Sequence, residues 1–142
     1  MIKYVLQKNP VKTSSSYGKW YARPKSDHMV ELEELAQHMA SHNTPFSAGA
    51  IKGILTDMVV CIKELLLDGK TVKLPDLAIF SVGIINKTGG AETVEEFQPA
   101  SNIEGLRLKC RATGSLRNAN LNGSLQRATV VDYKKEQTAG GE

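Results

Sequence analysis

Residues 68–82 read DGKTVKLPDLAIFSV, and the periodicity of the apolar residues changes within this stretch. A helical apolar pattern stops at Gly69, and beyond it the apolar residues alternate as they do in strands. Residues 71–74 form a short strand, Pro75-Asp76 makes a turn, and residues 78–85 form a longer strand. The stretch therefore predicts a passage from a helix into an antiparallel sheet.

Two amphipathic helices are expected before this passage. Apolar residues at helical spacing predict the first between Met29 and Ser41, and Asn43-Thr44-Pro45 breaks it. Ser47, or Thr44 with Pro45 in the first turn, caps the second helix. The broad apolar face of the second helix indicates either a large single core or a dimer interface; it consists of Ile51, Ile54, Leu55, Met58, Val59, Ile62, Leu65 and Leu66.

The chain after the longer strand returns to the sheet through an irregular excursion. Residues 86–105 hold four glutamates and one lysine, with one helical turn expected near residues 94–97. Residues 106–112 form the returning strand, and residues 115–128 predict a short, weak helix because asparagines and a glycine interrupt its leucines. The central region therefore has the order of two helices, three strands and a final helix.

Both ends of the chain differ from this central region. Residues 2–9 and 19–22 predict an N-terminal strand hairpin, in a segment, 1–28, that carries six basic residues and one acidic residue. Val130-Val131 suggests a brief strand, and the polar residues from Lys134 onward suggest a disordered tail. We accordingly expect a basic extension over residues 1–28, a main domain over 29–128 and a C-terminal tail over 129–142.

The composition indicates a soluble globular protein. The 142 residues are 41% hydrophobic and 23% charged, and the net charge of +3 combines basic ends with an acidic middle. No secretory signal and no membrane-spanning run is visible, and Cys61 and Cys110 lie in apolar surroundings that favour buried free thiols. We therefore expect a cytoplasmic protein without a membrane association.

The most informative candidate site lies on the returning strand. Because side chains alternate along a strand, Arg107, Lys109 and Arg111 point to one face, about 6–7 Å apart, which is close to the spacing of successive phosphates in a nucleic acid. A solvated outer face of an ordinary strand is the alternative. Arg117 just beyond the strand, and Lys70 and Lys73 on the neighbouring strand, favour a basic surface.

Other candidate residues have ordinary structural explanations. His38 and His42 are four residues apart, but no third ligand is placed to complete a metal site with them. Gly89-Gly90 is a turn or a flexible joint and lacks the context of a phosphate-binding loop. Tyr17, Trp20 and Tyr21 lie among basic residues, where they either stack on bases or pack the hairpin against the helices. No catalytic residue, metal site or cofactor is predicted.

The order of elements and residues 68–82 resemble the bacterial HU/IHF histone-like DNA-binding proteins. The similarity covers about residues 29–122. In that family a helix ends at glycine, Val-x-Leu follows, and Gly-Phe-Gly-x-Phe-x-Val continues; here Asp76-Leu77-Ala78 replaces the glycine signature, while Phe80 is kept. The returning strand into Gly114-Ser115-Leu116 is similar to the end of the family's last strand. The basic N-terminal segment resembles the extension of variant HU-like proteins common in Bacteroides.

The resemblance implies a fold and a function. The fold would be α+β, with two helices packed on a three-stranded antiparallel sheet, a β-arm excursion and a short C-terminal helix. The function would be non-enzymatic: a homodimer that binds double-stranded DNA with low sequence specificity in the nucleoid, without a cofactor or small-molecule substrate. The contacts with phosphates would come from Arg107, Lys109, Arg111, Arg117, Lys70, Lys73 and Lys87.

The excursion supports a second hypothesis. The family's arm is rich in arginine and wedges a proline between base pairs. Here the excursion has one basic residue, Lys87, and four acidic residues, Glu92, Glu95, Glu96 and Glu104. The negative charge of a phosphate repels these carboxylates. The alternative is an HU-fold module for protein interaction or assembly that has lost DNA binding.

Overall fold

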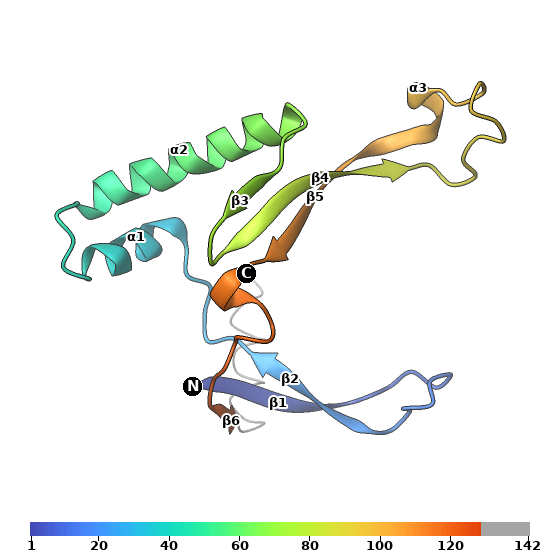
Figure 1. Ribbon diagram of the computed structural model, residues 1–142. Helices are drawn as coiled ribbons and strands as arrows, with labels where there is room; N and C mark the ends of the chain where they lie inside the picture. The colour runs from blue at the N-terminus through green and yellow to red at the C-terminus, as the bar shows by residue number, and fades with distance from the viewer. Residues whose placement is uncertain (129–142) are drawn as a thin grey trace, which may run out of the picture. The chain divides into compact units, whose positions relative to one another are not determined.

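The computed structural model describes residues 1–128, which form two compact units (Figure 1). In the first unit, β1 (Ile2–Lys8) pairs antiparallel with β2 (Trp20–Lys25), so the predicted N-terminal hairpin is confirmed. A third strand, β6 (Leu125–Arg127), pairs parallel with the other side of β1. The first unit is therefore a three-stranded sheet built from both ends of the described chain.

The predicted helix over residues 115–128 is wrong. The structure has a single 3-10 turn, η1 (Gly114–Leu116), and then irregular chain before β6. Asparagines and Gly123 disfavour a helix, and the backbone finds hydrogen bonds along the open edge of β1 instead, including one of 2.8 Å from the Ala128 amide to the Tyr4 carbonyl. The strand expected at Val130-Val131 and the tail from Lys134 lie outside the described residues.

The second unit, residues 32–121, begins with α1 (Leu32–Ala40) and α2 (Ala48–Leu67). The Ser47 hydroxyl caps α2 by accepting a hydrogen bond of 3.1 Å from the Ala50 amide, as the sequence predicted. Gly69 ends the helix with a φ of 74°, which favours glycine, and α2 contacts the sheet that follows it. No helix in the described part of the chain has the length and hydropathy to span a membrane.

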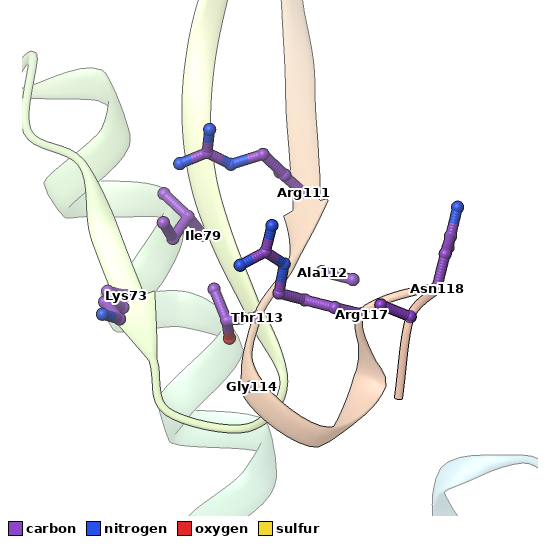
Figure 2. Close-up of a pocket in the computed structure, with 9 residues that line it drawn as sticks. Lys73, Ile79, Arg111, Ala112, Thr113, Gly114, Arg117 and Asn118 are labelled. Carbon is purple, nitrogen blue, oxygen red and sulfur yellow. The ribbon is translucent and has the colours of Figure 1, made fainter. Parts of the chain in front are cut away.

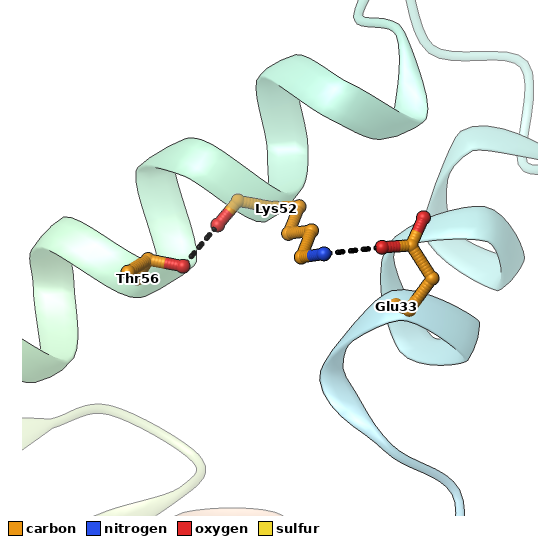
Figure 3. Close-up of polar contacts among 3 residues, drawn as sticks. All are labelled: Glu33, Lys52 and Thr56. Carbon is orange, nitrogen blue, oxygen red and sulfur yellow. Dashed lines mark hydrogen bonds and ion pairs between the residues drawn. The ribbon is translucent and has the colours of Figure 1, made fainter.

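A polar contact connects α1 with α2. Figure 3 shows the ammonium of Lys52 on α2 paired with the carboxylate of Glu33 on α1, while the Thr56 hydroxyl donates to the Lys52 carbonyl one turn along α2. Both charged groups are about half exposed, so solvent screens the pair and its contribution to stability is at most about 1 kcal/mol. The packing of apolar residues between the helices is therefore the larger stabilising term.

The sheet of the second unit has the strand order β3-β4-β5 and is antiparallel throughout, with strands β3 (Val72–Leu74), β4 (Ala78–Asn86) and β5 (Ile103–Ala112). Figure 1 shows β4 and β5 continuing past β3 as a two-stranded ribbon. The ribbon ends in a loop and in α3 (Pro99–Asn102), which lies after the turn expected at residues 94–97. We call residues 87–102 the arm.

Few apolar side chains are buried in the described chain. Ala36, Ile51, Leu66 and Ala78 form the buried core, whereas Ile54 and Val59 on α2 are 60% and 59% exposed. Burial of Cys61 and Cys110 was a wrong prediction, since both are exposed. Cys61 lies on α2 and Cys110 on β5. A single chain therefore covers the broad apolar face of α2 only in part: Ile51 and Leu66 are buried, whereas Ile54, Val59 and Leu65 are exposed.

Candidate nucleic-acid interface

Basic side chains form a row on β5. In the register of the sheet, Arg107 pairs with Gly83, Lys109 with Ser81 and Arg111 with Ile79. Residues directly opposite each other in a sheet lie on the same face, so the three cations share one face with small or uncharged residues of β4. The alternation predicted from the sequence is thus present, and no carboxylate of β4 faces the row.

Gly83 lets two of these cations lie across β4. The residue is buried, and a Cβ atom built on it would lie 2.8 Å from Cε of Lys109 and 3.2 Å from Nε of Arg107. The side chains of Lys109 and Arg107 therefore cover Gly83 from above. This glycine was not identified from the sequence, although an isolated glycine inside a strand pattern is a known signal of close approach.

Lys73 and Arg117 extend the basic surface beyond the row. Lys73 on β3 pairs with Ile79, which pairs in turn with Arg111, so all three lie on the same face. Figure 2 shows Arg111 and Arg117 extending into a cavity of about 630 Å³ that Lys73 also lines. We call Lys73, Arg107, Lys109, Arg111 and Arg117 the cationic surface.

Hydrogen bonds join the turn before β4 to the segment after β5, beside this cavity. The Asp76 carboxylate accepts a hydrogen bond of 2.9 Å from the Ser115 amide, and the buried Thr113 hydroxyl donates one of 3.0 Å to the Leu74 carbonyl. Gly114 has a φ of 54°, and a Cβ atom there would lie 1.9 Å from the Asp76 carboxylate oxygen. This junction sets the direction in which the chain leaves β5 and so places Arg117.

The charge of the cationic surface is not neutralised by neighbouring side chains. Within residues 1–128, none of its five members forms an ion pair with a carboxylate. Four uncompensated positive charges on one face of a small sheet, with Arg117 beyond its end, attract anions, and the spacing of about 6–7 Å along β5 fits consecutive phosphates. The arrangement is suited to binding a polyanion.

Two of the predicted cations lie elsewhere. Lys70 precedes β3, where its ammonium pairs with Asp68 at the end of α2. Lys87 begins the arm, and its ammonium donates a hydrogen bond of 3.1 Å to the Ala100 carbonyl. Both side chains therefore have partners within their own segments.

The arm is acidic and its loop is ordered by hydrogen bonds. Asn102 donates to the Gly90 carbonyl at 3.0 Å and accepts from the Gln98 amide at 2.9 Å, which closes the loop. The residues of this loop are exposed to solvent. Val94 is 87% exposed, and the acidic residues Glu92, Glu95 and Glu96 are also exposed. The acidic arm therefore differs in charge from the cationic surface of the same sheet.

The opposite face of the sheet is apolar. Phe80 pairs with Cys110 and Val82 with Leu108 on that face, and α2 borders it. Together these elements line an apolar groove of about 420 Å³, in which Leu106 and Leu108 are 58% and 63% exposed. The sheet thus separates a basic face from an apolar face that the single chain leaves open.

His38 on α1 and His42 just after the end of α1 contact each other. Nε2 of His38 and Nε2 of His42 lie 3.0 Å apart, and their rings meet edge to face. Among the described residues, no group of three or more His, Cys, Asp or Glu side chains is gathered as a metal site would require.

The chain resembles known proteins in fold and in family. A comparison with curated proteins finds no match. Among solved structures, a "putative bacterial DNA binding protein" from Bacteroides vulgatus is similar with a TM-score of 0.63 and 14% identity, over 91% of this chain and 50% of that one. The chain thus spans about half the length of that protein, and at this identity the likeness concerns the fold. Residues 1–127 match the family HU-HIG, described as an HU domain fused to wHTH, Ig, or glycine-rich motif. The chain therefore belongs to this family of HU-like domains.

Proposed function

We propose that the chain binds double-stranded DNA through phosphate contacts made by the cationic surface. The observation that carries this proposal is the gathering of five unpaired cations on one face of the β3-β4-β5 sheet and at its end. Membership of the HU-like family and the description of the Bacteroides vulgatus protein both support a nucleic-acid partner. Lys70 and Lys87 contribute less to this binding, because each has a partner of its own.

Contacts of this kind determine affinity rather than sequence preference. Phosphates are the same at every base pair, so arginine and lysine side chains that reach only phosphates carry little sequence information. The proposed role is therefore architectural and non-enzymatic, as a nucleoid-associated protein in the cytoplasm. Residues 1–28 would be the extension of the variant HU-like type found in Bacteroides.

We also propose that the DNA-binding form is a homodimer. The apolar groove formed by α2, β4 and β5 leaves Leu106 and Leu108 exposed, and such residues rarely face water as one contiguous patch. A second copy that covers the groove with its own α2 would join two sheets into one basic saddle. The resemblance to HU/IHF proteins implies the same arrangement.

A salt titration tests the proposal. If the five cations of one chain contact phosphates, the slope of log affinity against log salt will be about −4 to −5 per bound chain. The double variant Arg107→Glu/Arg111→Glu will lose most of the duplex affinity, whereas Lys70→Glu/Lys87→Glu, with the same change of charge, will lose much less. Fluorescence anisotropy with a labelled duplex at several salt concentrations measures both. Equal losses for the two double variants would contradict the proposed surface.

The acidic arm favours the second candidate function. Its exposed glutamates would repel a duplex, so an HU-fold module that binds a protein remains the alternative. Purification from cells after nuclease treatment separates the two functions. A protein partner that stays bound, together with no affinity for duplex DNA at low salt, would favour the alternative.

A further inference from the structure

The N-terminal hairpin carries a second cavity, distant in sequence from the cationic surface. Its volume is about 360 Å³, within the range of about 300–1,000 Å³ typical of small-molecule sites. Gln7, Lys8, Tyr21 and Arg23 come from β1 and β2, and Ser16 comes from the loop between the strands. We call this the hairpin cavity.

The wall of the hairpin cavity combines an aromatic ring with a cation. Tyr21 pairs with Gln7 and Arg23 pairs with Val5, so the side chains of Tyr21 and Arg23 lie two residues apart on the same face of β2. Tyr21 is 43% exposed. A flat π-face beside a guanidinium is the combination on which unpaired nucleobases stack, with the cation available to the adjoining phosphate.

The polar groups of the cavity are available to a ligand. Within residues 1–128, the side-chain amide of Gln7 and the Ser16 hydroxyl form no hydrogen bond, and Arg23 forms no ion pair. An amide has both donors and acceptors, so Gln7 can read the edge of a base that stacks on Tyr21. Arg23 supplies positive charge in the same cavity.

The hairpin loop holds this arrangement in place before any ligand arrives. The Asn9 amide donates to the Lys19 carbonyl at 2.9 Å, and the Gly18 amide returns a hydrogen bond to the Asn9 carbonyl at 3.1 Å. The Asn9 side chain accepts from the Val11 amide at 3.0 Å, and Ser14 accepts from the Ser16 amide at 3.1 Å. A loop ordered in this way loses little conformational entropy on binding.

We propose that the hairpin cavity binds an unpaired nucleotide of a single-stranded nucleic acid, with the base on Tyr21 and its phosphate near Arg23. This site goes beyond the proposed duplex binding, because it lies in the other compact unit and requires a base that is not paired. Single-stranded DNA and RNA share the chemistry that it recognises.

Substitutions inside and outside the cavity test the proposal in the full chain. The probes are labelled oligodeoxythymidine and oligouridine of about 12 nucleotides, within the range of known single-strand sites. Tyr21→Ala and Arg23→Gln change the cavity, and Tyr17→Ala and Lys12→Gln are the matched controls, since Tyr17 is also exposed and neither residue lines the cavity. Circular dichroism checks the fold of each variant, and Tyr21→Phe retains an aromatic ring if Tyr21→Ala unfolds the hairpin.

The expected result is a loss confined to the cavity variants. Tyr21→Ala will weaken single-strand binding by about fivefold to a hundredfold, the effect of one lost base–aromatic stack, while Tyr17→Ala and Tyr21→Phe will stay near the wild type. The oligonucleotide that shows the larger Tyr21-dependent loss identifies DNA or RNA as the ligand. Equal affinities of Tyr21→Ala and Tyr17→Ala for both oligonucleotides would overturn the proposal.

Two further comparisons distinguish binding at the hairpin cavity from binding at the cationic surface. The double variant Arg107→Glu/Arg111→Glu will weaken duplex binding. When Tyr21→Ala is added to this double variant, it will still weaken single-strand binding. Tyr21→Ala will leave duplex affinity unchanged. If Tyr21→Ala weakens duplex and single-strand binding equally, the cavity does not recognise an unpaired base and the proposal fails.

Discussion

Gly83 links the packing of a single residue to the proposed function. A methyl group at this position would meet Cε of Lys109 at 2.8 Å and Nε of Arg107 at 3.2 Å, which are parts of flexible side chains. We expect Gly83→Ala to leave the sheet folded but to displace both cations. Duplex affinity will fall severalfold, and the salt slope will decrease by about one contact in an anisotropy titration.

Gly105 is the matched control for this prediction. It lies on the neighbouring strand, opposite Ile85, and a Cβ atom there would meet nothing within 4 Å. Gly105→Ala should therefore leave both the duplex affinity and the salt slope unchanged. If Gly83→Ala behaves in the same way, the positions of Lys109 and Arg107 over Gly83 do not matter for binding.

Asp27 provides a pH-dependent prediction in the first unit. The ammonium of Lys3 donates a hydrogen bond of 2.9 Å to the Asp27 carboxylate and adds its charge, and both effects lower the pKa of Asp27. Because the pKa is lower in the folded state, the stabilisation is fully present above the unfolded pKa of about 3.9 and is lost as the pH falls through the folded pKa. An NMR titration should show the lowered pKa of Asp27, and Lys3→Met should raise it toward the usual range. An unchanged pKa in that variant would show that Lys3 is not the cause.

The sequence predicted the basic row but not the residues that support it. Alternation along one strand places Arg107, Lys109 and Arg111 on one face, and this needs no knowledge of the neighbouring strand. The role of Gly83 depends on the register between β4 and β5, and local sequence does not determine that register. Lys87 shows the same limit, because its partner, the Ala100 carbonyl, lies across the arm.

Gly114 lies at the junction between the turn before β4 and η1. Gly114 has a positive φ, and a Cβ atom there would collide with the Asp76 carboxylate. We expect Gly114→Ala to lower the free energy of unfolding by about 1–3 kcal/mol. In an Asp76→Gly background the same substitution will cost less, because the colliding carboxylate is gone. Thermal unfolding of the four proteins of this cycle measures the coupling. Equal costs in both backgrounds would mean that Gly114 and Asp76 act independently.

Elements with strong local signals were predicted well, and the end of the chain was not. Ser47 and Gly69 mark the ends of α2 by capping and by a left-handed conformation, both of which are local effects. The leucines of residues 115–128 suggested a helix, but the pairing of β6 with β1 joins segments more than a hundred residues apart. A three-residue strand of this kind is stabilised by tertiary hydrogen bonds that sequence patterns do not contain.

The proposed homodimer would determine how many phosphates one complex contacts. Leu108 on β5 is 63% exposed and lines the apolar groove beside α2. If a second chain covers this groove, Leu108→Glu places a charge in an apolar interface and costs several kcal/mol. The variant should then be a monomer by light scattering coupled to size exclusion, while the wild type has twice the mass of one chain.

The same variant also tests whether dimerisation supports DNA binding. Two cationic surfaces in one complex give a salt slope about twice that of a single chain, so Leu108→Glu should roughly halve the slope and lower the duplex affinity. Val94→Glu is the control, because Val94 is an exposed apolar residue of the arm that does not line the groove. A wild-type protein that is monomeric, or a Leu108→Glu variant that keeps the full mass and slope, would contradict the proposed dimer. A variant that becomes monomeric yet keeps the full slope would show instead that each copy binds DNA through a surface larger than the five cations.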